Sequence, residues 1–281
     1  MSQILRMTKH HGLGNDFLVA LADDNVDVDL EVEIDAVVAR RLCDRHRGIG
    51  ADGVIVAVDS ATGDADARMV LRNSDGSLAE ISGNGIRCLA QAMTRSLGRR
   101  NATLQIETGA GRRPVEVSEG EDASTEIVRV DMGRVGPGPQ PTVDLAATAH
   151  DARRFETAEV GNPHLVVLVD SLDDVDVVSE GRRLESCFAD GINVHFLVVP
   201  NRERVRLAHW ERGAGVTMAC GSGATVAATV AHRWGMVDSR VLVSMPGGDA
   251  VVEVGEAEPD GTRVGHLCGP AVLVGRIEVA L

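Results

Sequence analysis

An internal repeat limits the folds open to this chain more than any other feature of the sequence. Four short segments of the first half recur, in the same order, in the second half. They are Gly14–Val19 with Gly161–Val166, Gly48–Gly50 with Gly191–Asn193, Ser82–Gly85 with Cys220–Gly223, and Gly111–Val117 with Gly248–Val254. The separation between matching segments falls smoothly, from 147 residues for the first pair to 137 for the last. We infer two homologous halves of about 130–140 residues each.

Short apolar runs bounded by turn residues predict many strands in both halves. The expected strands are Gly53–Val58, Arg68–Arg72, Thr103–Glu107, Pro114–Val117, Ile127–Asp131, Leu165–Asp170, Val194–Val199, Arg204–Trp210, Arg240–Ser244, Ala250–Val254 and Ala271–Val279. Helices are expected at Glu33–Asp44, Gly85–Leu97 and Gly223–Gly235. The stretch Gly133–Pro141 is rich in Gly and Pro and is expected to be a linker.

The expected fold class is therefore α/β, of the α+β kind, with two pseudo-symmetric homologous halves. We assign residues 1–132 plus about 272–281 to the N-terminal half and 133–271 to the C-terminal half. If a pseudo-twofold axis relates the halves, equivalent residues face each other across a shared cleft. The equivalent residues of most interest are Ser82 and Cys220, each of which precedes a Gly-x-Gly sequence that opens an expected helix.

The charge balance argues against several partners and cofactors. Of 281 residues, 28 are basic and 42 are acidic, which gives a formal net charge of −14. We expect such a chain to bind neither nucleic acid nor an anionic membrane, and with 2% aromatic residues it has few platforms for stacking bases. Lys9, the only lysine, falls in the first apparent strand. A pyridoxal-phosphate Schiff base is therefore not expected, and the lysine of a Walker-type phosphate loop is missing.

The cysteines and the N-terminus favour a reducing compartment. The chain has five Cys, an odd number without Cys-x-x-Cys spacing. Met1 to Lys9 lacks the apolar core of a signal peptide, and no run of about 18 apolar residues is present to span a membrane. We expect a cytoplasmic protein with reduced thiols. The cysteines expected only to pack are Cys43, Cys88, Cys187 and Cys268.

Cys220 is the strongest candidate for chemistry. It precedes Gly221-Ser222-Gly223 at the start of an expected helix, where the helix dipole and unpaired amides favour negative charge. Such surroundings lower a thiol pKa from about 8.5 toward neutrality. The alternative is a cysteine that merely packs at a strand-to-helix turn.

The matching segment of the first half is Ser82–Gly85, with Asn73–Gly76 shortly before it. The amides of Gly83 and Asn84, opposite those of Gly221 and Ser222, would make two nests for anions, and a carboxylate is the natural ligand. The alternative for Asn73–Gly76 is a plain turn.

Other polar residues fit recognition of an amino acid. Arg212 offers a bidentate cation for a carboxylate, although a surface salt bridge at a strand end would explain it as well. Asn15, Asn162 and Asn193 adjoin Gly-containing turns, where they could contact ammonium and carboxylate groups or simply cap the turns. His164 could tune a thiol, act as an acid or be a structural histidine. His10, His11 and His46 lack partners at ligand spacing, so no metal is expected.

Taken together, these residues resemble the diaminopimelate epimerase family. The segments that carry the resemblance are His11–Phe17, Gly48–Gly53, Gly161–His164, Glu211–Gly215 and Ala219–Gly223. The resemblance runs from about residue 7 to the end of the chain. It implies two similar halves, each a curved sheet wrapped around a central helix, with the active site in the cleft between them.

The resemblance also implies an activity. Members are cofactor-independent epimerases in which one cysteine thiolate removes the α-proton of an amino acid and a thiol on the opposite face returns one. By motif, Cys220 is one of the pair, and His164 is a supporting residue. The substrate contacts carried over by motif are Asn15, Asn73, Gly83, Asn84, Asn162, Asn193, Glu211, Arg212, Gly221 and Ser222. The resemblance further implies a small amino-acid substrate and a homodimer.

Two positions depart from the family pattern. Ser82 stands where the family has its other catalytic cysteine, and Cys88 matches a later, non-catalytic position. A hydroxyl with a pKa near that of water, about 15.7, is roughly 7 units less acidic than a thiol near 8.5, which amounts to at most about 9–10 kcal/mol of lost driving force. Val216 stands where the family usually has Glu, so we expect a buried charge of the site to be lost or moved.

Three hypotheses about function follow. The first is a diaminopimelate epimerase, impaired because the cysteine at position 82 was replaced deliberately. The second is a divergent relative in which Cys220 is the main base and the reaction is racemisation, isomerisation or dehydration of another amino acid; Val216 favours it. The third is a non-catalytic amino-acid-binding protein, which the presence of Cys220 at a helix N-terminus argues against.

Overall fold

The computed structural model describes residues 4–60, 63–145 and 154–280. The chain divides into two compact units. Unit 1 comprises Met1–Val130 and Gly269–Leu281, and unit 2 comprises Asp131–Cys268. The expected boundaries were at residue 132 and about residue 272. The segment Met1 to Lys9 was expected to contain no signal peptide. Its residues 1–3 lie outside the described part of the chain, and β1 begins at Ile4.

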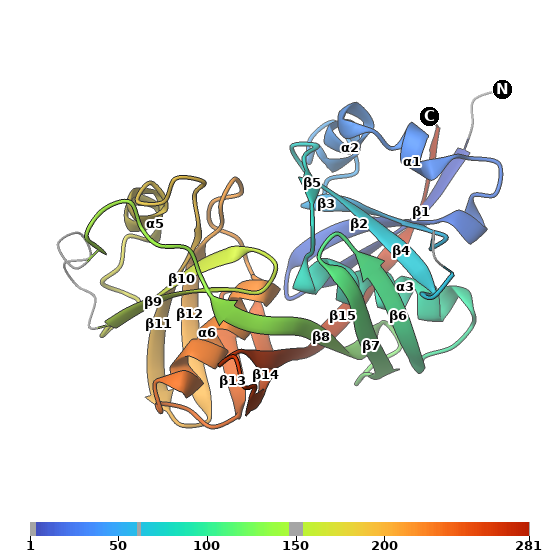
Figure 1. Ribbon diagram of the computed structural model, residues 1–281. Helices are drawn as coiled ribbons and strands as arrows, with labels where there is room; N and C mark the ends of the chain where they lie inside the picture. The colour runs from blue at the N-terminus through green and yellow to red at the C-terminus, as the bar shows by residue number, and fades with distance from the viewer. Residues whose placement is uncertain (1–3, 61–62, 146–153, 281) are drawn as a thin grey trace. The chain divides into compact units, whose positions relative to one another are not determined.

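Unit 1 is built mainly of strands (Figure 1). Its elements are β1 (Ile4–Gly12), β2 (Asn15–Leu21), η1 (Ala22–Asp24), α1 (Leu30–Glu33), α2 (Ala36–Cys43), β3 (Gly53–Val58), β4 (Ala67–Asn73), β5 (Leu78–Ala79), α3 (Gly83–Ser96), β6 (Ala102–Thr108), β7 (Gly111–Glu119) and the first part of β8 (Thr125–Pro137). The last part of β15 (Arg263–Ala280) completes it, antiparallel to β1.

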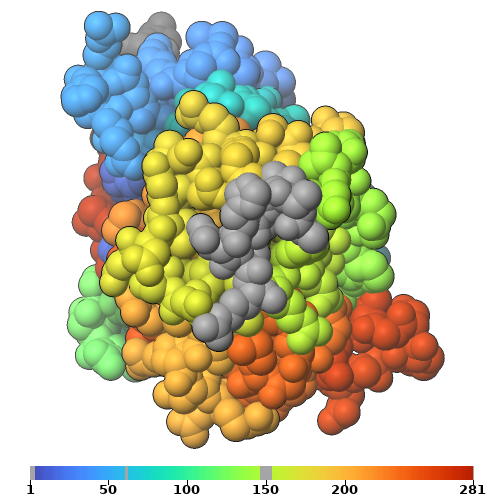
Figure 2. All heavy atoms as spheres, turned by 90° about the vertical axis from the view of Figure 1, so that its left-hand side faces the viewer, coloured from blue at the N-terminus to red at the C-terminus, as the bar shows by residue number. Residues whose placement is uncertain are grey.

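Unit 2 repeats this plan. Its elements are the end of β8, then β9 (Arg154–Glu159), β10 (Pro163–Leu168), α5 (Val177–Glu185), β11 (Asn193–Asn201), β12 (Arg204–Trp210), α6 (Gly221–Arg233), β13 (Arg240–Met245), β14 (Gly248–Ala257) and the first part of β15. α5 buries only Gly181 and Leu184, and the yellow segments that include it lie on the surface facing the viewer in Figure 2.

The strand pairing confirms that the two halves are repeats. In unit 1, β2 and β3 are parallel, β3 and β4 antiparallel, and β4 and β6 parallel. In unit 2, β10 and β11 are parallel, β11 and β12 antiparallel, and β12 and β13 parallel. Each parallel pair is joined by a helical crossover, as parallel neighbours require. The fold is therefore α+β, with few helices and two copies of one arrangement.

A central helix organises each unit. α3 packs against β1, β2, β3, β4, β6 and β7, and α6 packs against strands β9 to β14. In Figure 1, α6 lies among the strands of unit 2. The first ten residues of α3 and the first eleven of α6 are buried, as expected for a helix enclosed on all sides. The sheet of each unit wraps around its helix.

Two expectations about local structure need correction. The helix expected at Glu33–Asp44 is present as α2 but begins only at Ala36, because the side chain of Asp35 caps it by accepting from the amides of Val37 and Val38 at 2.8 Å, and Glu33 instead ends the preceding short helix α1. The expected linker Gly133–Pro141 is largely the end of β8. Its Gly133 takes a φ of 93°, and Gly136 pairs with Glu159 of β9, so the chain remains a strand there.

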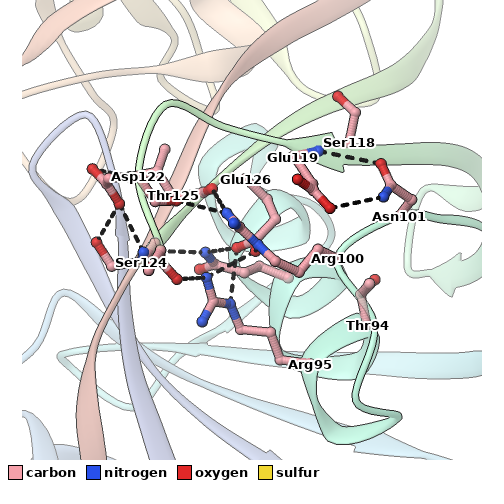
Figure 3. Close-up of polar contacts among 12 residues, drawn as sticks. Thr94, Arg95, Arg100, Asn101, Ser118, Glu119, Asp122, Ser124, Thr125 and Glu126 are labelled. Atoms are coloured by element: carbon pink, nitrogen blue, oxygen red, sulfur yellow. Dashed lines mark hydrogen bonds and ion pairs between the residues drawn. The ribbon is translucent and has the colours of Figure 1, made fainter.

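A buried carboxylate ties the far end of α3 to β8. Glu126 is fully buried and accepts hydrogen bonds from Arg95 at 2.8 Å and Arg100 at 2.8 Å, which converge on it in Figure 3. It also accepts from Gln91, whose oxygen contacts His10 Nδ1 at 2.7 Å. Burial raises the pKa of Glu126, but the hydrogen bonds from Arg100, Gln91 and Arg95 outweigh it and hold the pKa below its usual range.

No helix among the described residues is both long enough and apolar enough to cross a membrane.

We predict that Glu126→Gln destabilises the protein by about 3 kcal/mol at pH 7, because two arginines lose a buried partner. The folded-state pKa of Glu126 is lowered, so this contribution is complete above its unfolded pKa near 4.5 and fades as the pH falls through the folded value. Urea unfolding of both proteins at pH 7, 5 and 3.5 measures it. The control is Glu116→Gln, whose carboxylate is 62% exposed, and an equal loss in both variants would contradict the prediction.

Candidate functional site

Ser82 begins the central helix of unit 1. Its backbone is extended, and its Oγ accepts a hydrogen bond from the amide of Gly85 at 3.0 Å. The first helical hydrogen bond runs from the Ile86 amide to the Ser82 carbonyl at 2.9 Å. The amides of Gly83 and Asn84 therefore belong to the first turn, where a helix supplies no acceptor of its own.

Cys220 occupies the matching place in unit 2. It is extended like Ser82, and the Ala224 amide donates to its carbonyl at 2.9 Å. The Gly223 amide faces its sulfur, as the Gly85 amide faces the oxygen of Ser82. The two side chains are thus equivalent N-caps, one in each unit.

A polar network holds the amides of unit 1. Asn84 Nδ2 donates to Asn15 Oδ1 at 2.9 Å, and Asn15 Nδ2 donates to Asp52 at 2.7 Å. Arg45 bridges Asp52 and Asp16 with contacts of 2.7 and 2.6 Å. The network orients Asn15 and Asn84 at the N-terminus of α3.

Asn73 lies beside this network, and Lys9 belongs to it. Asn73 ends β4, and the amide of the next residue, Ser74, donates to the Asp52 carbonyl at 2.9 Å. Asn73 itself donates to Ser77 Oγ at 3.0 Å, so its amide stabilises a turn. Lys9 pairs with Asp16 at 2.9 Å and donates to the Gly50 carbonyl at 2.6 Å, so the only lysine has a structural partner.

Asn193 connects the polar loops of unit 2. Its Nδ2 donates to the Pro163 carbonyl at 3.0 Å, and its Oδ1 accepts from the Arg212 amide at 3.0 Å. The Arg212 guanidinium donates to the Asp190 carbonyl at 2.9 Å. No carboxylate of the described residues forms an ion pair with Arg212, so the alternative of a strand-end salt bridge is wrong.

Glu211 is the charged neighbour of Cys220. Its carboxylate hydrogen-bonds with the thiol and also accepts from the Thr217 hydroxyl. Ser222 Oγ lies 3.7 Å from the sulfur. Residues 211–215 form a tight turn in which the Glu211 and Gly215 backbones exchange hydrogen bonds of 2.7 and 2.8 Å. This turn holds the backbone of Glu211, from which the carboxylate side chain extends, in place.

The expected low pKa of Cys220 is wrong. Burial raises the pKa of the thiol most, the charge of Glu211 raises it further, and the Gly223 amide and Ser222 hydroxyl lower it by less. Helix N-terminal amides favour a thiolate, but an adjacent carboxylate in a buried place opposes it more strongly. Cys220 therefore rests as a neutral thiol with a carboxylate ready to accept its proton.

His164 is a buried histidine bonded at both ring nitrogens. Nε2 lies 2.8 Å from Asn162 Oδ1, and Nδ1 lies 2.8 Å from His195 Nε2. Burial, with a smaller contribution from the charge of Arg212, lowers its pKa to about 3. It is neutral near pH 7 and orients Asn162, so a role as a resting acid is not supported.

The structure gives the other cysteines and Val216 no part in these hydrogen-bond networks. Burial raises the pKa of Cys43 and of Cys88 to about 12; Cys187 is also buried, and Cys268 is half-buried. Val216 is 52% exposed, so the expectation that this position lost a buried charge is wrong. In the described part of the chain, no three His, Cys, Asp or Glu residues gather as metal ligands.

Sequence inspection missed several residues of these networks. Asp16 and Asp52 lie in the Gly-containing motifs that were quoted, but only the structure shows that they anchor Asn15. Thr217 lies in the loop after Glu211 without a distinguishing pattern. His195 and His209 occupy buried positions of β11 and β12, and a polar residue in an apolar strand pattern is the signal that could have found them.

Comparison with known proteins decides the family. The sequence profile described as diaminopimelate epimerase matches residues 7–136 and 157–274. The chain belongs to the diaminopimelate epimerase family. A diaminopimelate epimerase of Methanothermobacter thermautotrophicus is 36% identical over 96% of this chain and 97% of its own length. One from Synechocystis is 37% identical over 98% of this chain and 99% of its own length.

Solved structures support the fold of this family member. A hydroxyproline epimerase from Agrobacterium vitis, solved with trans-4-hydroxy-L-proline, has a TM-score of 0.71 at 17% identity, covering 100% of this chain and 94% of that one. A phenazine biosynthesis protein from Bacillus anthracis has a TM-score of 0.72 at 17% identity, covering 99% of each chain. At such identities the likeness concerns the fold alone.

For this epimerase-family chain, we predict slow alkylation of Cys220 by iodoacetamide at neutral pH and a steep rise in alkaline solution, because the thiol pKa is raised. Glu211→Gln removes the neighbouring charge, so the rise should move to lower pH, with a rate about tenfold higher at pH 8. Peptide-resolved mass spectrometry separates Cys220 from half-buried Cys268, the internal control. A plateau below pH 8 in the unaltered protein would contradict the assignment.

Proposed function

We propose that this protein is a cofactor-independent amino-acid epimerase that interconverts LL- and meso-diaminopimelate, a step in lysine and peptidoglycan precursor synthesis. The observation that carries the proposal is the contact between the half-buried Glu211 carboxylate and the buried Cys220 thiol at the N-terminus of α6. A neutral thiol beside a carboxylate can change protonation state in either direction. As the thiol it donates a proton to an α-carbanion, and after passing its proton to Glu211 it accepts one from the α-carbon.

Both units supply groups that suit the α-carboxylate and ammonium of an amino acid. The first-turn amides of Gly83, Asn84, Gly221 and Ser222 are oriented for an anion. Arg212 adds a cation that no described carboxylate neutralises, and Asn15, Asn73, Asn162 and Asn193 offer amides. We propose that the two sets contact one substrate, and that negative charge developing at its carboxylate in the carbanion is stabilised there.

Ser82 is the less effective acid–base group of this proposed mechanism. As an N-cap its Oγ accepts from Gly85, and its hydroxyl hydrogen is available to a substrate or a water. A hydroxyl does not serve as an efficient base without an activating neighbour. Proton transfer on its side of the substrate is therefore slow, while Cys220 exchanges the α-proton on its own side. The protein should exchange faster than it inverts.

We predict that incubation with LL-diaminopimelate in D2O gives α-deuteration with little meso product. Ser82→Cys should raise the rate of inversion by about 10²–10⁴-fold, the usual contribution of a positioned acid or base. Mass spectrometry follows deuteration, and chiral chromatography follows the LL/meso ratio. Cys220→Ser should abolish exchange and serves as the control.

The outcomes separate the hypotheses. Fast inversion by Ser82→Cys alone identifies Ser82 as the lesion in an otherwise intact diaminopimelate epimerase. Exchange in neither protein means that diaminopimelate is not the substrate. Ser82 at the N-cap of α3 and an exposed Val216 in the loop before Cys220 favour a second candidate, a divergent relative that acts on another amino acid with Cys220 as main base. Screening amino acids for α-deuteration tests it.

We predict that Arg212→Ala weakens binding of LL-diaminopimelate about ten- to hundredfold, because a charge-assisted contact to the carboxylate is lost. Isothermal titration calorimetry gives the Kd without requiring turnover. Arg206→Ala, on the exposed side of β12, is the matched control and should bind as the unaltered protein does. Equal affinity in both variants would remove Arg212 from the proposed site.

The resemblance to the family further suggests a homodimer in the cytoplasm that uses neither metal nor organic cofactor. Light scattering after size exclusion measures the oligomeric state, and activity after treatment with a chelator measures any need for metal.

A further inference from the structure

β12 places a histidine where its pattern calls for an apolar residue. Val205, Leu207 and His209 alternate on the inward face of the strand, and His209 is 1% exposed. Burial lowers the pKa of His209 to about 4, so the ring is neutral near pH 7. Burying a polar group costs folding free energy unless the group is hydrogen-bonded. The hydrogen bonds of the His209 ring are therefore informative.

A chain of hydrogen bonds leads from this ring to Cys220. His209 Nε2 lies 2.9 Å from Thr217 Oγ. The Thr217 hydroxyl donates to Glu211 Oε1, and the Glu211 carboxylate hydrogen-bonds with the Cys220 thiol. All four residues belong to unit 2.

The direction of the bonds determines the tautomer of His209. The Thr217 hydroxyl has one hydrogen, and the ionised carboxylate of Glu211 can only accept. The hydrogen of the His209–Thr217 bond must therefore come from His209 Nε2. His209 Nδ1 is then unprotonated, and it has no hydrogen-bond partner among the described residues. A donor at Nε2 prevents the hydroxyl from turning toward the ring and leaves Glu211 as its acceptor.

We propose that His209 is a positioning residue for Cys220. Through Thr217 it holds one oxygen of Glu211, so that the carboxylate stays ionised and lies against the thiol. The thiol consequently keeps its proton at rest and has a fixed acceptor when it must give that proton up. The proposal rests on the proposed function only in taking Cys220 as the acid–base group, and it holds for any amino-acid substrate.

The groups around His209 and Cys220 show which charge acts on the thiol. His195 lies directly opposite His209 on β11, with ring centroids 6.0 Å apart, but its Nε2 bonds to His164 on β10. Among the described residues, His164, His195 and Glu211 are the titratable groups that act on His209, on its neighbour His195 or on Cys220. Burial lowers the pKa of both histidines, so both are neutral near pH 7, and the charge that acts on Cys220 is that of Glu211.

The test is the pH profile of Cys220 alkylation by iodoacetamide, read by peptide-resolved mass spectrometry. His209→Leu and Thr217→Val each break the chain, so the Glu211 charge is no longer held at the sulfur. Each should raise the rate at pH 8 about three- to tenfold, as expected for a thiol pKa lowered by roughly half to one unit. The double variant should show no larger rate increase than either single variant, because both substitutions break the same chain of hydrogen bonds.

Conservative variants provide the rescue. His209→Gln keeps an N–H donor near the Nε2 position without a titrating ring, and Thr217→Ser keeps the hydroxyl; both should retain the original profile. His232→Leu removes a histidine at the opposite end of α6, where Nδ1 bonds to the Val237 carbonyl at 3.0 Å, and controls for general loosening. Thermal unfolding checks that each variant is folded.

Three results would overturn the proposal: an unchanged profile in Thr217→Val, additive shifts in the double variant, or a shift in His209→Gln as large as that in His209→Leu. If His209→Leu fails to fold, Thr217→Val with Thr217→Ser still decides the matter, since Thr217 is half-buried in a loop. Alkylation needs no substrate, so a failure of diaminopimelate turnover leaves this test intact and separates the two proposals.

Discussion

Enclosing one helix within the sheet of each unit is the constraint on which the rest of the structure depends. α3 and α6 are buried along most of their length, so their N-termini lie at fixed places among the surrounding strands. The first-turn amides of a helix have no partners within it. Each of these starts carries two glycines, Gly83 and Gly85 in α3 and Gly221 and Gly223 in α6, and all four are buried. At Gly223 there is no room for a side chain, because a Cβ would lie 2.0 Å from the His195 ring.

This constraint also explains the electrostatics of the cysteine. The amides of a helix N-terminus would stabilise a thiolate, but burial of the Cys220 thiol raises its pKa most, and the charge of the half-buried Glu211 raises it further. Hydrogen bonds then decide where the charge lies: the turn at residues 211–215 fixes the backbone of Glu211, and Thr217 occupies one carboxylate oxygen. Behind Thr217 stands a neutral histidine in the strand core, so the polar network continues into the interior.

The sequence predicted best those features of the structure that are determined by residues close together along the chain. Strands such as Gly53–Val58 and Arg204–Trp210 were predicted with their observed bounds, because an apolar run between turn residues acts locally. The helix expected at Glu33–Asp44 was predicted three residues too early, because Asp35 caps α2 inside an otherwise helical pattern and the helix begins at Ala36. The supposed linker failed because Gly and Pro were counted as breakers, while the pairing of Gly136 with Glu159 keeps that stretch in a strand. The direction of the Cys220 pKa shift was predicted wrongly because the thiol is buried in the fold and because Glu211, nine residues away along the chain, is adjacent to it in space.

The sequence by itself determined the duplication, the family and the residue types of the candidate site, since these are recorded in motifs and their order. It also determined that Ser82 and Cys220 are equivalent, because both open the same kind of segment. Tertiary structure decided everything that depends on distance: that Asp52 holds Asn15, that His164 and His195 share a hydrogen bond, and that burial together with Glu211 keeps Cys220 protonated. Hydrogen bonds and charge effects act over a few ångströms in space, and only the folded chain determines which residues come that close.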